Sequence, residues 1–361
     1  MNSGHTNLEV SHSLICWRSC RLADIPKRIV SMNRYIILFI LLATVLFAVE
    51  GSWGDMDPAY QRCLYICETT ECGRVPPSIN GYIKKDSRKH TPYLIPYQII
   101  PLTCEENCNY GCIEEITANR LALNLGVAKY HGHWPFTRYL GLEEPASVVF
   151  SILNAVPHFA YFWGSCRQYL ISKKNQRCYI TPWLLFYSVI ACFCWISSAI
   201  YHSKKTFYTT QLDLITALAF ITFGLFMALR RIFGRSVSSL QVNSVAVAMF
   251  AGWAYRAYSM AQGLVRFDSH MHVSIGIVVL TTILWLLWIL HAQFVSTERA
   301  GLSVKYVCLL CQVWLICASG LEIFDFPPFY GIFDAHSLWH AVTIPLGFLW
   351  YKFWDWDKPF R

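Results

Sequence analysis

The stretch 181–231, TPWLLFYSVIACFCWISSAIYHSKKTFYTTQLDLITALAFITFGLFMALRR, decides the fold class. It contains two apolar runs, 182–202 and 210–229, each close to the roughly 20 residues that a helix needs to cross a bilayer. A short loop with Lys204 and Lys205 separates the two runs. Because lipid offers no hydrogen-bond partner to an open backbone, we expect both runs to form membrane-spanning helices.

Five further apolar runs occur along the chain, at 145–164, 239–260, 272–293, 304–323 and 335–353. The 361-residue chain is 55% hydrophobic and only 14% charged, whereas a soluble domain carries about 25% charged residues. We therefore predict an all-α membrane protein with seven transmembrane helices. The net charge of +8 does not indicate a nucleic-acid partner, because most basic residues lie in short loops between the apolar runs.

The basic residues are divided unequally between alternate loops. One set of loops, together with the C-terminal tail, contains Arg167, Lys173, Lys174, Arg177, Arg230, Arg231, Arg235, Arg299, Lys305, Lys352, Lys358 and Arg361. The opposite loops contain only Lys204, Lys205 and Arg266. The positive-inside rule places the first set in the cytosol, and it places the segment before the first run on the luminal side.

A shorter apolar run at 35–49 follows a positive flank and precedes small residues. This pattern is typical of a cleaved signal peptide, which we place at 32–52, with an uncleaved signal anchor as the alternative. Met32 would make a normal start, so residues 1–31 are interpreted as an upstream extension. A signal peptide independently requires the segment that follows it to be luminal.

The segment 53–144 is polar and rich in cysteine, and we expect it to be a separate luminal domain. Six of the fifteen cysteines lie in it: Cys63, Cys67, Cys72, Cys104, Cys108 and Cys112. An even, clustered set behind a signal-like segment is typical of a disulfide framework. A zinc cluster is the alternative, but neither C-x3-C-x4-C nor C-x3-C-x3-C contains the C-x2-C pair common in structural zinc sites. We predict three disulfides, and the pairing stays open.

Ionisable residues inside membrane helices are costly, so each is a functional candidate. The run 182–202 ends at His202, Asp213 lies near the start of the next run, and the last run opens with His336 and His340. The predicted topology brings all three helix ends to the luminal side. Residues far apart in the sequence should therefore share one depth in the membrane.

The spacing of these residues predicts a metal site. His336 and His340 are one helical turn apart and share a face, and His202 would complete a set of three. Three histidines with one open position are typical of a catalytic zinc site, where the metal activates a water and polarises a carbonyl. Asp213 would take or relay the proton of that water. Ser198, one turn before His202, would donate a hydrogen bond to the developing oxyanion.

Simpler interpretations exist for each of these residues. Ser198 alone is more often a packing residue, and Asp213 alone could be a helix cap. A Ser-His-Asp triad would use Ser198, His202 and Asp213 but leaves His336 and His340 unexplained.

A second group of polar residues lies just before the first run, in the motif KYHGHWPF. There His131 and Trp134 are candidates for contact with a substrate head group, with packing at the membrane interface as the alternative.

Three longer motifs carry a resemblance to a known family. The motifs are KYHGHWPFTRYLGLEEPASVVFSILN (129–154), SSAIYHSKKTFYTTQLD (197–213) and DAHSLWHAVTIPLGF (334–348). They resemble the signatures of the post-GPI-attachment lipid-remodelling family, whose members have phospholipase A2-like activity. The resemblance covers about 55–361, and one departure is His133, which stands where a lysine is expected.

The resemblance implies a fold and a reaction. The family belongs with the alkaline ceramidases and adiponectin-type receptors, which implies Zn²⁺ on the three histidines, with Ser198 and Asp213 in the catalytic site. The implied reaction is fatty-acid remodelling of GPI-anchored proteins in the Golgi membrane or the endoplasmic reticulum, by removal of the sn-2 acyl chain from the inositol phospholipid. A ceramidase-like amidase and a non-catalytic, receptor-like protein remain alternatives. The long luminal domain argues against the first, and the complete residue set argues against the second.

Overall fold

The structure is a computed structural model, and it describes residues 52–73, 100–172, 182–233, 238–265, 267–294 and 302–357. The expected upstream extension 1–31 and the signal peptide, apart from its last residue, lie outside these ranges. The same holds for several of the basic residues used for orientation, namely Lys173, Lys174, Arg177, Arg235, Arg266, Arg299, Lys358 and Arg361. Within the described ranges the regular structure is helical, and bridges between extended residues are isolated.

In these ranges, seven long helices follow the Cys-rich segment. They are α4 (Pro145–Ser172), α5 (Pro182–Ser203), α6 (Phe207–Phe233), α7 (Ser239–Ala261), α8 (Phe267–Phe294), α9 (Leu302–Phe324) and α10 (Ala335–Asp357). Every predicted apolar run is thus a helix, although most helices extend beyond the predicted bounds. Polar residues at helix ends continue the helix where the apolar run has stopped, as at the start of α6 and the end of α4.

Five of the seven helices, α4, α5, α6, α8 and α9, are long and apolar enough to cross a membrane. The other two, α7 and α10, have 23 residues each. The polarity of α10 has a clear source, because it carries His336 and His340 near its start and Asp355 and Asp357 near its end. The predicted membrane class is confirmed, and the full count of seven spans stays a proposal.

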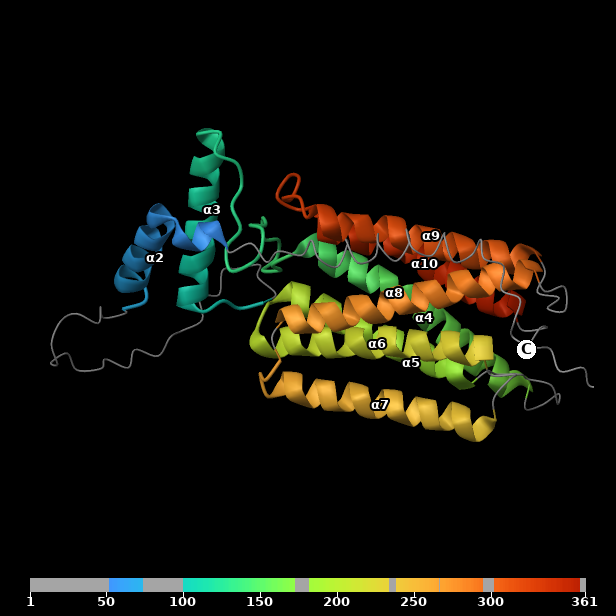
Figure 1. Cartoon of the computed structure of the whole chain (residues 1–361). Helices are drawn as coiled ribbons and strands as arrows, with labels where there is room; N and C mark the ends of the chain where they lie inside the picture. Colours follow the sequence, from blue (N-terminus) through green and yellow to red (C-terminus); the bar gives the residue numbers. More distant parts are fainter. Residues whose placement is uncertain are drawn as a thin grey trace, which may run out of the picture. The chain divides into compact units, whose positions relative to one another are not determined.

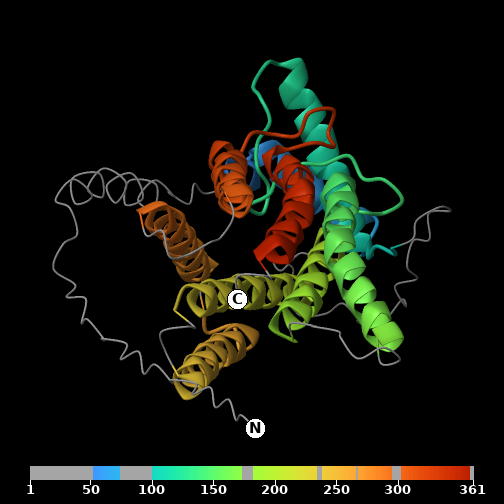
Figure 2. The same cartoon turned by 90° about the vertical axis from the view of Figure 1, so that its right-hand side faces the viewer.

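Six helices close into a ring. α4 packs against α5, α5 against α6, α6 against α8, α8 against α9, α9 against α10, and α10 against α4. Figure 2 shows α10, in red, between α9 and the green α4. Among the described residues α7 packs against α6, at the edge of the bundle (Figure 1), where the Trp253 indole donates a hydrogen bond to the Ile215 carbonyl at 3.1 Å. The ring brings the end of α5 beside the start of α10.

A buried ion pair joins α6 to α10 where both helices end. The Arg231 guanidinium donates to both carboxylate oxygens of Asp357, at 2.7 and 2.8 Å, and the two side chains are 5% and 0% exposed. Arg231 also lies over the ring of Trp288, with its guanidinium carbon 4.9 Å from the ring centre. Such a two-point contact fixes the geometry of both helices as well as their charge balance.

Replacing Asp357 by alanine is expected to destabilise the bundle by about 3–5 kcal/mol, because it leaves an uncompensated buried charge on Arg231. Thermal unfolding in detergent would measure the change. Asp355→Ala, two residues away on the exposed side of α10, is the matched control and should unfold close to the wild type. Equal stability of the two variants would contradict a structural role for the pair.

The Cys-rich segment is built on α2 (Pro58–Thr70) and α3 (Cys104–Ala122), preceded by a short 3-10 turn, η1 (Trp53–Met56). The side chain of Asp57 caps α2, and Thr103 and Glu106 form a capping box at the start of α3. Both helices therefore begin at sequence signals that satisfy their free N–H groups. Tyr60 of α2, Ile116 of α3 and Tyr130 belong to a small hydrophobic core that the two helices share.

All six predicted cysteines are paired, so the predicted framework of three disulfides is confirmed. The pairs are Cys63–Cys112, Cys67–Cys108 and Cys72–Cys104. Cysteines later in the first half of the segment pair with cysteines earlier in the second half, so α2 and α3 run antiparallel. Cys72, Cys104 and Cys108 also lie near one another, because the last two bridges are neighbours.

Peptide mapping without reduction should recover these three pairs and no others. The bridges close loops with sequence separations of 49, 41 and 32 residues, so each should stabilise the segment by about 4 kcal/mol through the entropy of the unfolded chain. Free thiols at these six positions in folded protein would contradict the framework.

Candidate metal centre

Three histidine nitrogens converge where α5 ends and α10 begins. The Nε2 atom of His202 lies 3.4 Å from that of His336 and 3.2 Å from that of His340, and the last two are 3.0 Å apart. The turn spacing of His336 and His340 on α10 places both rings on the face that meets α5. The three residues predicted as ligands are thus brought together, and they form a group that could hold a metal ion.

These distances can be compared with the geometry of a metal centre. Zinc–nitrogen bonds of about 2.0–2.1 Å at the tetrahedral angle separate two ligand nitrogens by about 3.3 Å. The observed separations of 3.0–3.4 Å agree with this value. His202 and His340 are each only 2% exposed, so water does not readily satisfy their nitrogens. The donor set and its spacing therefore fit a small divalent cation.

Carboxylates orient two of the three imidazoles. Nδ1 of His202 lies 2.5 Å from Glu144 Oε2, and Nδ1 of His336 lies 2.7 Å from Glu322 Oε1. With the proton on Nδ1, each ring donates to its carboxylate and directs the lone pair of Nε2 to the centre. This is the usual support of a metal-binding histidine.

His340 is held differently. Its Nδ1 is buried without a hydrogen-bond partner among the described residues. Its ring packs edge-on against Trp195 and Trp339, with ring centres 5.5 and 4.9 Å away. Packing, rather than a carboxylate, fixes this third imidazole.

Glu144 connects the centre to its surroundings. Its second carboxylate oxygen pairs with Lys205, and its backbone N–H donates to the His202 carbonyl at 3.0 Å. Burial opposes ionisation of this carboxyl, yet Lys205 and His202 together hold its pKa well below its usual range. Glu144 is therefore an anion that binds the end of α5 at three points.

The two predicted catalytic residues lie on either side of the short connection between α5 and α6. Ser198 is buried one turn before His202, and its Oγ is 3.1 Å from Ser151 Oγ on α4. Asp213 lies within electrostatic range of His336 and Glu144. In the described part of the chain no direct hydrogen bond joins Asp213 to the three histidines, so a water or substrate would have to connect them. Their catalytic roles stay predictions.

His131 and Trp134, the residues predicted to contact a substrate head group, form hydrogen bonds within the protein. The His131 N–H donates to Asp55 Oδ1 at 2.8 Å, and its ring lies 3.0 Å from the Tyr60 hydroxyl. The Trp134 indole donates to Asp325 Oδ1, just after α9, at 2.9 Å. These contacts favour a structural task for both residues, although a contact with substrate stays a prediction.

Sequence reasoning overlooked Glu144 and Glu322. Glu322 is an ionisable residue near the end of an apolar run, and the cost of such a residue in lipid was a usable signal. Glu144 stands just before Pro145 at a helix start, where acidic residues are common for other reasons. Only the folded ring reveals that it faces His202.

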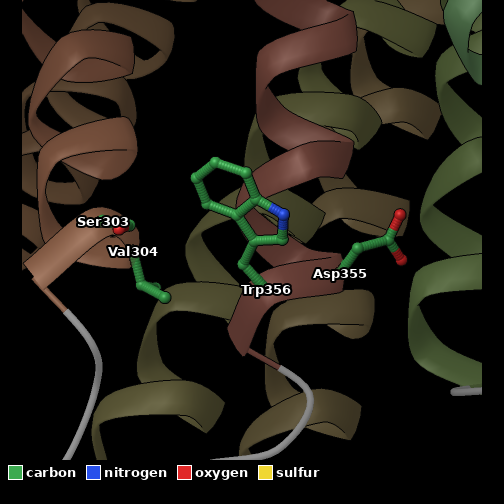
Figure 3. A pocket seen from close by; sticks show the side chains of 4 residues that line it. All are labelled: Ser303, Val304, Asp355 and Trp356. Atoms are coloured by element: carbon green, nitrogen blue, oxygen red, sulfur yellow. The ribbon is translucent and has the colours of Figure 1, made fainter.

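A separate recess lies far from this centre. It is lined by Ser303, Val304, Asp355 and Trp356, at the start of α9 and the end of α10 (Figure 3), and its volume is about 340 Å³. From His336 to Trp356 the helix rises about 30 Å. The recess therefore does not belong to the histidine centre.

Comparisons with known proteins identify a family and several relatives. The Per1-like family model matches residues 95–358, which include all three histidines and both candidate catalytic residues. A Xenopus laevis protein named GPI-specific phospholipase A2-like PGAP3 is 29% identical over 89% of this chain and 93% of its own length.

Two further relatives cover almost as much of the chain. The Drosophila melanogaster protein named post-GPI attachment to proteins factor 3 is 29% identical over 87% of the chain and 92% of its own length. The human protein that shares the name of the Xenopus relative is 27% identical over 88% and 93%. The family match alone spans well over half of the sequence, and the chain belongs to the Per1-like family.

Proposed function

We propose that this protein is a zinc-dependent acyl-ester hydrolase that removes the sn-2 fatty acid from the inositol phospholipid of GPI anchors. The convergence of three Nε2 atoms at 3.0–3.4 Å carries the proposal, because three imidazoles at this spacing fit a catalytic metal. The names of the relatives support the substrate, since they refer to GPI and to phospholipase A2. GPI-anchored proteins and membrane lipid are then its partners.

His202, His336 and His340 would hold the metal. When bound, Zn²⁺ with an open position supplies a Lewis acid for the ester carbonyl and lowers the pKa of a water to near 7. Glu144 and Glu322 keep Nδ1 of His202 and His336 protonated, so that their Nε2 atoms stay available as ligands. His202 and His340 are buried, which strengthens the electrostatic contacts around them, whereas the His336 side chain is 39% exposed.

Asp213 and Ser198 have different catalytic roles. Asp213, near His336, accepts the proton of the attacking water and returns it to the leaving glycerol oxygen. Ser198 donates a hydrogen bond to the oxyanion that forms on the ester carbonyl. Ser151, 3.1 Å away, can donate its own proton to Ser198 Oγ, which leaves the Ser198 proton for the substrate.

The site also fits a place in the secretory pathway. We propose that all seven helices span the membrane, with the disulfide-bonded segment in the lumen and the C-terminus in the cytosol. Disulfides persist in oxidising compartments, and GPI anchors lie in the luminal leaflet, where the end of α5 and the start of α10 would meet them. The Golgi membrane is the proposed location, with the endoplasmic reticulum as the alternative.

The purified protein is expected to carry about one zinc, and the double change His336→Ala and His340→Ala should remove it, because one imidazole cannot hold a catalytic zinc. Glu144→Gln should keep the metal but bind it about 10–100-fold more weakly. Elemental analysis and chelator competition would measure both effects. Glu114→Gln, an exposed carboxylate on α3, is the control and should match the wild type. Full metal content in the double variant would exclude this centre.

Cells that lack the protein should retain unsaturated sn-2 chains on their GPI anchors, and Asp213→Asn should fail to restore remodelling. The carboxamide is nearly isosteric but cannot accept a proton, a role worth about 10²–10⁴-fold in rate. Ser198→Ala should lose less, about 10²–10³-fold. Mass spectrometry of anchor lipids would measure the outcome.

The zinc content of Asp213→Asn is the necessary control, because the variant must be folded and loaded. Full remodelling by this variant would refute the role of Asp213 as proton acceptor. It would favour a non-catalytic role in anchor exchange.

A further inference from the structure

His133 lies near the three-histidine centre and has no role in the mechanism above. It closes a tight turn in which Tyr130 and His133 exchange two backbone hydrogen bonds, both of 2.8 Å. The two residues between them, His131 and Gly132, have φ values of 50° and 82°. Positive φ at both central positions is the mark of a type I′ turn, which leaves little freedom in the direction of the residue that follows.

Contacts on both sides hold this turn. The backbone N–H of His131 donates to Asp55 Oδ1, in the segment that carries the disulfides, at 2.8 Å. On the other side, the next residue, Trp134, is bound to Asp325 between α9 and α10. The backbone of His133 is therefore fixed between the disulfide-bonded segment and the helix ends that carry the site.

The side chain of His133 is placed beside the three-histidine group but is not part of it. Glu144, Lys205, His202 and His336 all lie within electrostatic range of its imidazole. Its nitrogens are not among those that lie within 4.8 Å of one another in the candidate ligand group. The side chain is exposed, and it makes no side-chain hydrogen bond within the described ranges. It is thus a reachable donor at the edge of the centre.

The protonation state agrees with a donor role. Partial desolvation by nearby protein atoms lowers the pKa of His133, and the positive charge of Lys205 acts in the same direction, against the opposing effect of Glu144. At neutral pH the imidazole is then uncharged, with one N–H to donate and one nitrogen to accept.

We propose that His133 donates a hydrogen bond to the phosphate group of the phospholipid whose ester lies at the three-histidine centre. This inference rests on the proposed function. In a phospholipid the phosphate is attached to the glycerol carbon next to the one that carries the sn-2 ester. A group that contacts the phosphate must therefore lie beside the ligand set and outside it, which is the position of His133.

Binding of two fluorescent lipids would test the inference on purified, metal-loaded protein in detergent micelles. One lipid is phosphatidylinositol, and the other is diacylglycerol, which has the same esters but no phosphate. His133→Ala should bind phosphatidylinositol about 10–100-fold more weakly, because a hydrogen bond to a charged group is lost. Its affinity for diacylglycerol should not change.

Two variants complete the design. His133→Lys restores a donor and should recover the preference for phosphatidylinositol, whereas His272→Ala, an exposed histidine on α8, should behave as the wild type. Equal weakening for both lipids in His133→Ala, or loss of its metal, would overturn the inference. Because lipid binding and fatty-acid release are measured separately, a wild type that binds through His133 but releases no fatty acid would contradict the proposed function alone.

Discussion

The hydrogen bond between Glu144 and His202 is the contact on which the candidate site depends. Nδ1 of His202 and Oε2 of Glu144 are 2.5 Å apart, just before α4 begins. Glu144 also binds the backbone of α5 and the ammonium of Lys205. Three imidazoles with converging lone pairs would repel one another unless a cation lies between them. The Glu144 carboxylate fixes the direction of the Nε2 lone pair of His202. The closed ring of helices then places the Nε2 atoms of His336 and His340 beside it.

The disulfide-bonded segment supports this arrangement from outside the bundle. Glu106 on α3 pairs with Lys204 at 2.9 Å, next to the lysine that binds Glu144. The guanidinium of Arg138 lies 3.4 Å from the ring centre of Tyr110 on α3 and pairs with Glu143. The segment with the three disulfides therefore contacts Lys204 and Arg138, and Arg138 in turn pairs with Glu143, the neighbour of Glu144. This gives a physical reason for the segment in a protein whose candidate site lies at its helix ends.

Much of this could be read from the sequence, because it depends on local pattern. The apolar runs predicted the helices, and the turn spacing of His336 and His340 predicted their common face. What could not be read depends on packing between distant segments. The pairing of the six cysteines, the placement of α7 outside the ring and the contact of Glu144 with His202 all require the fold. His133 shows the same limit, since only the turn and its anchors place it near the site.

The most direct test of the account is the reaction itself in water labelled with oxygen-18. Purified, metal-loaded protein is incubated with an inositol phospholipid that carries an unsaturated sn-2 chain, and the products are followed by mass spectrometry. We expect the lysophospholipid and a free fatty acid with one oxygen-18 atom, because water attacks the ester carbonyl. Release of no fatty acid, release from the sn-1 position, or an acid without the label would contradict it.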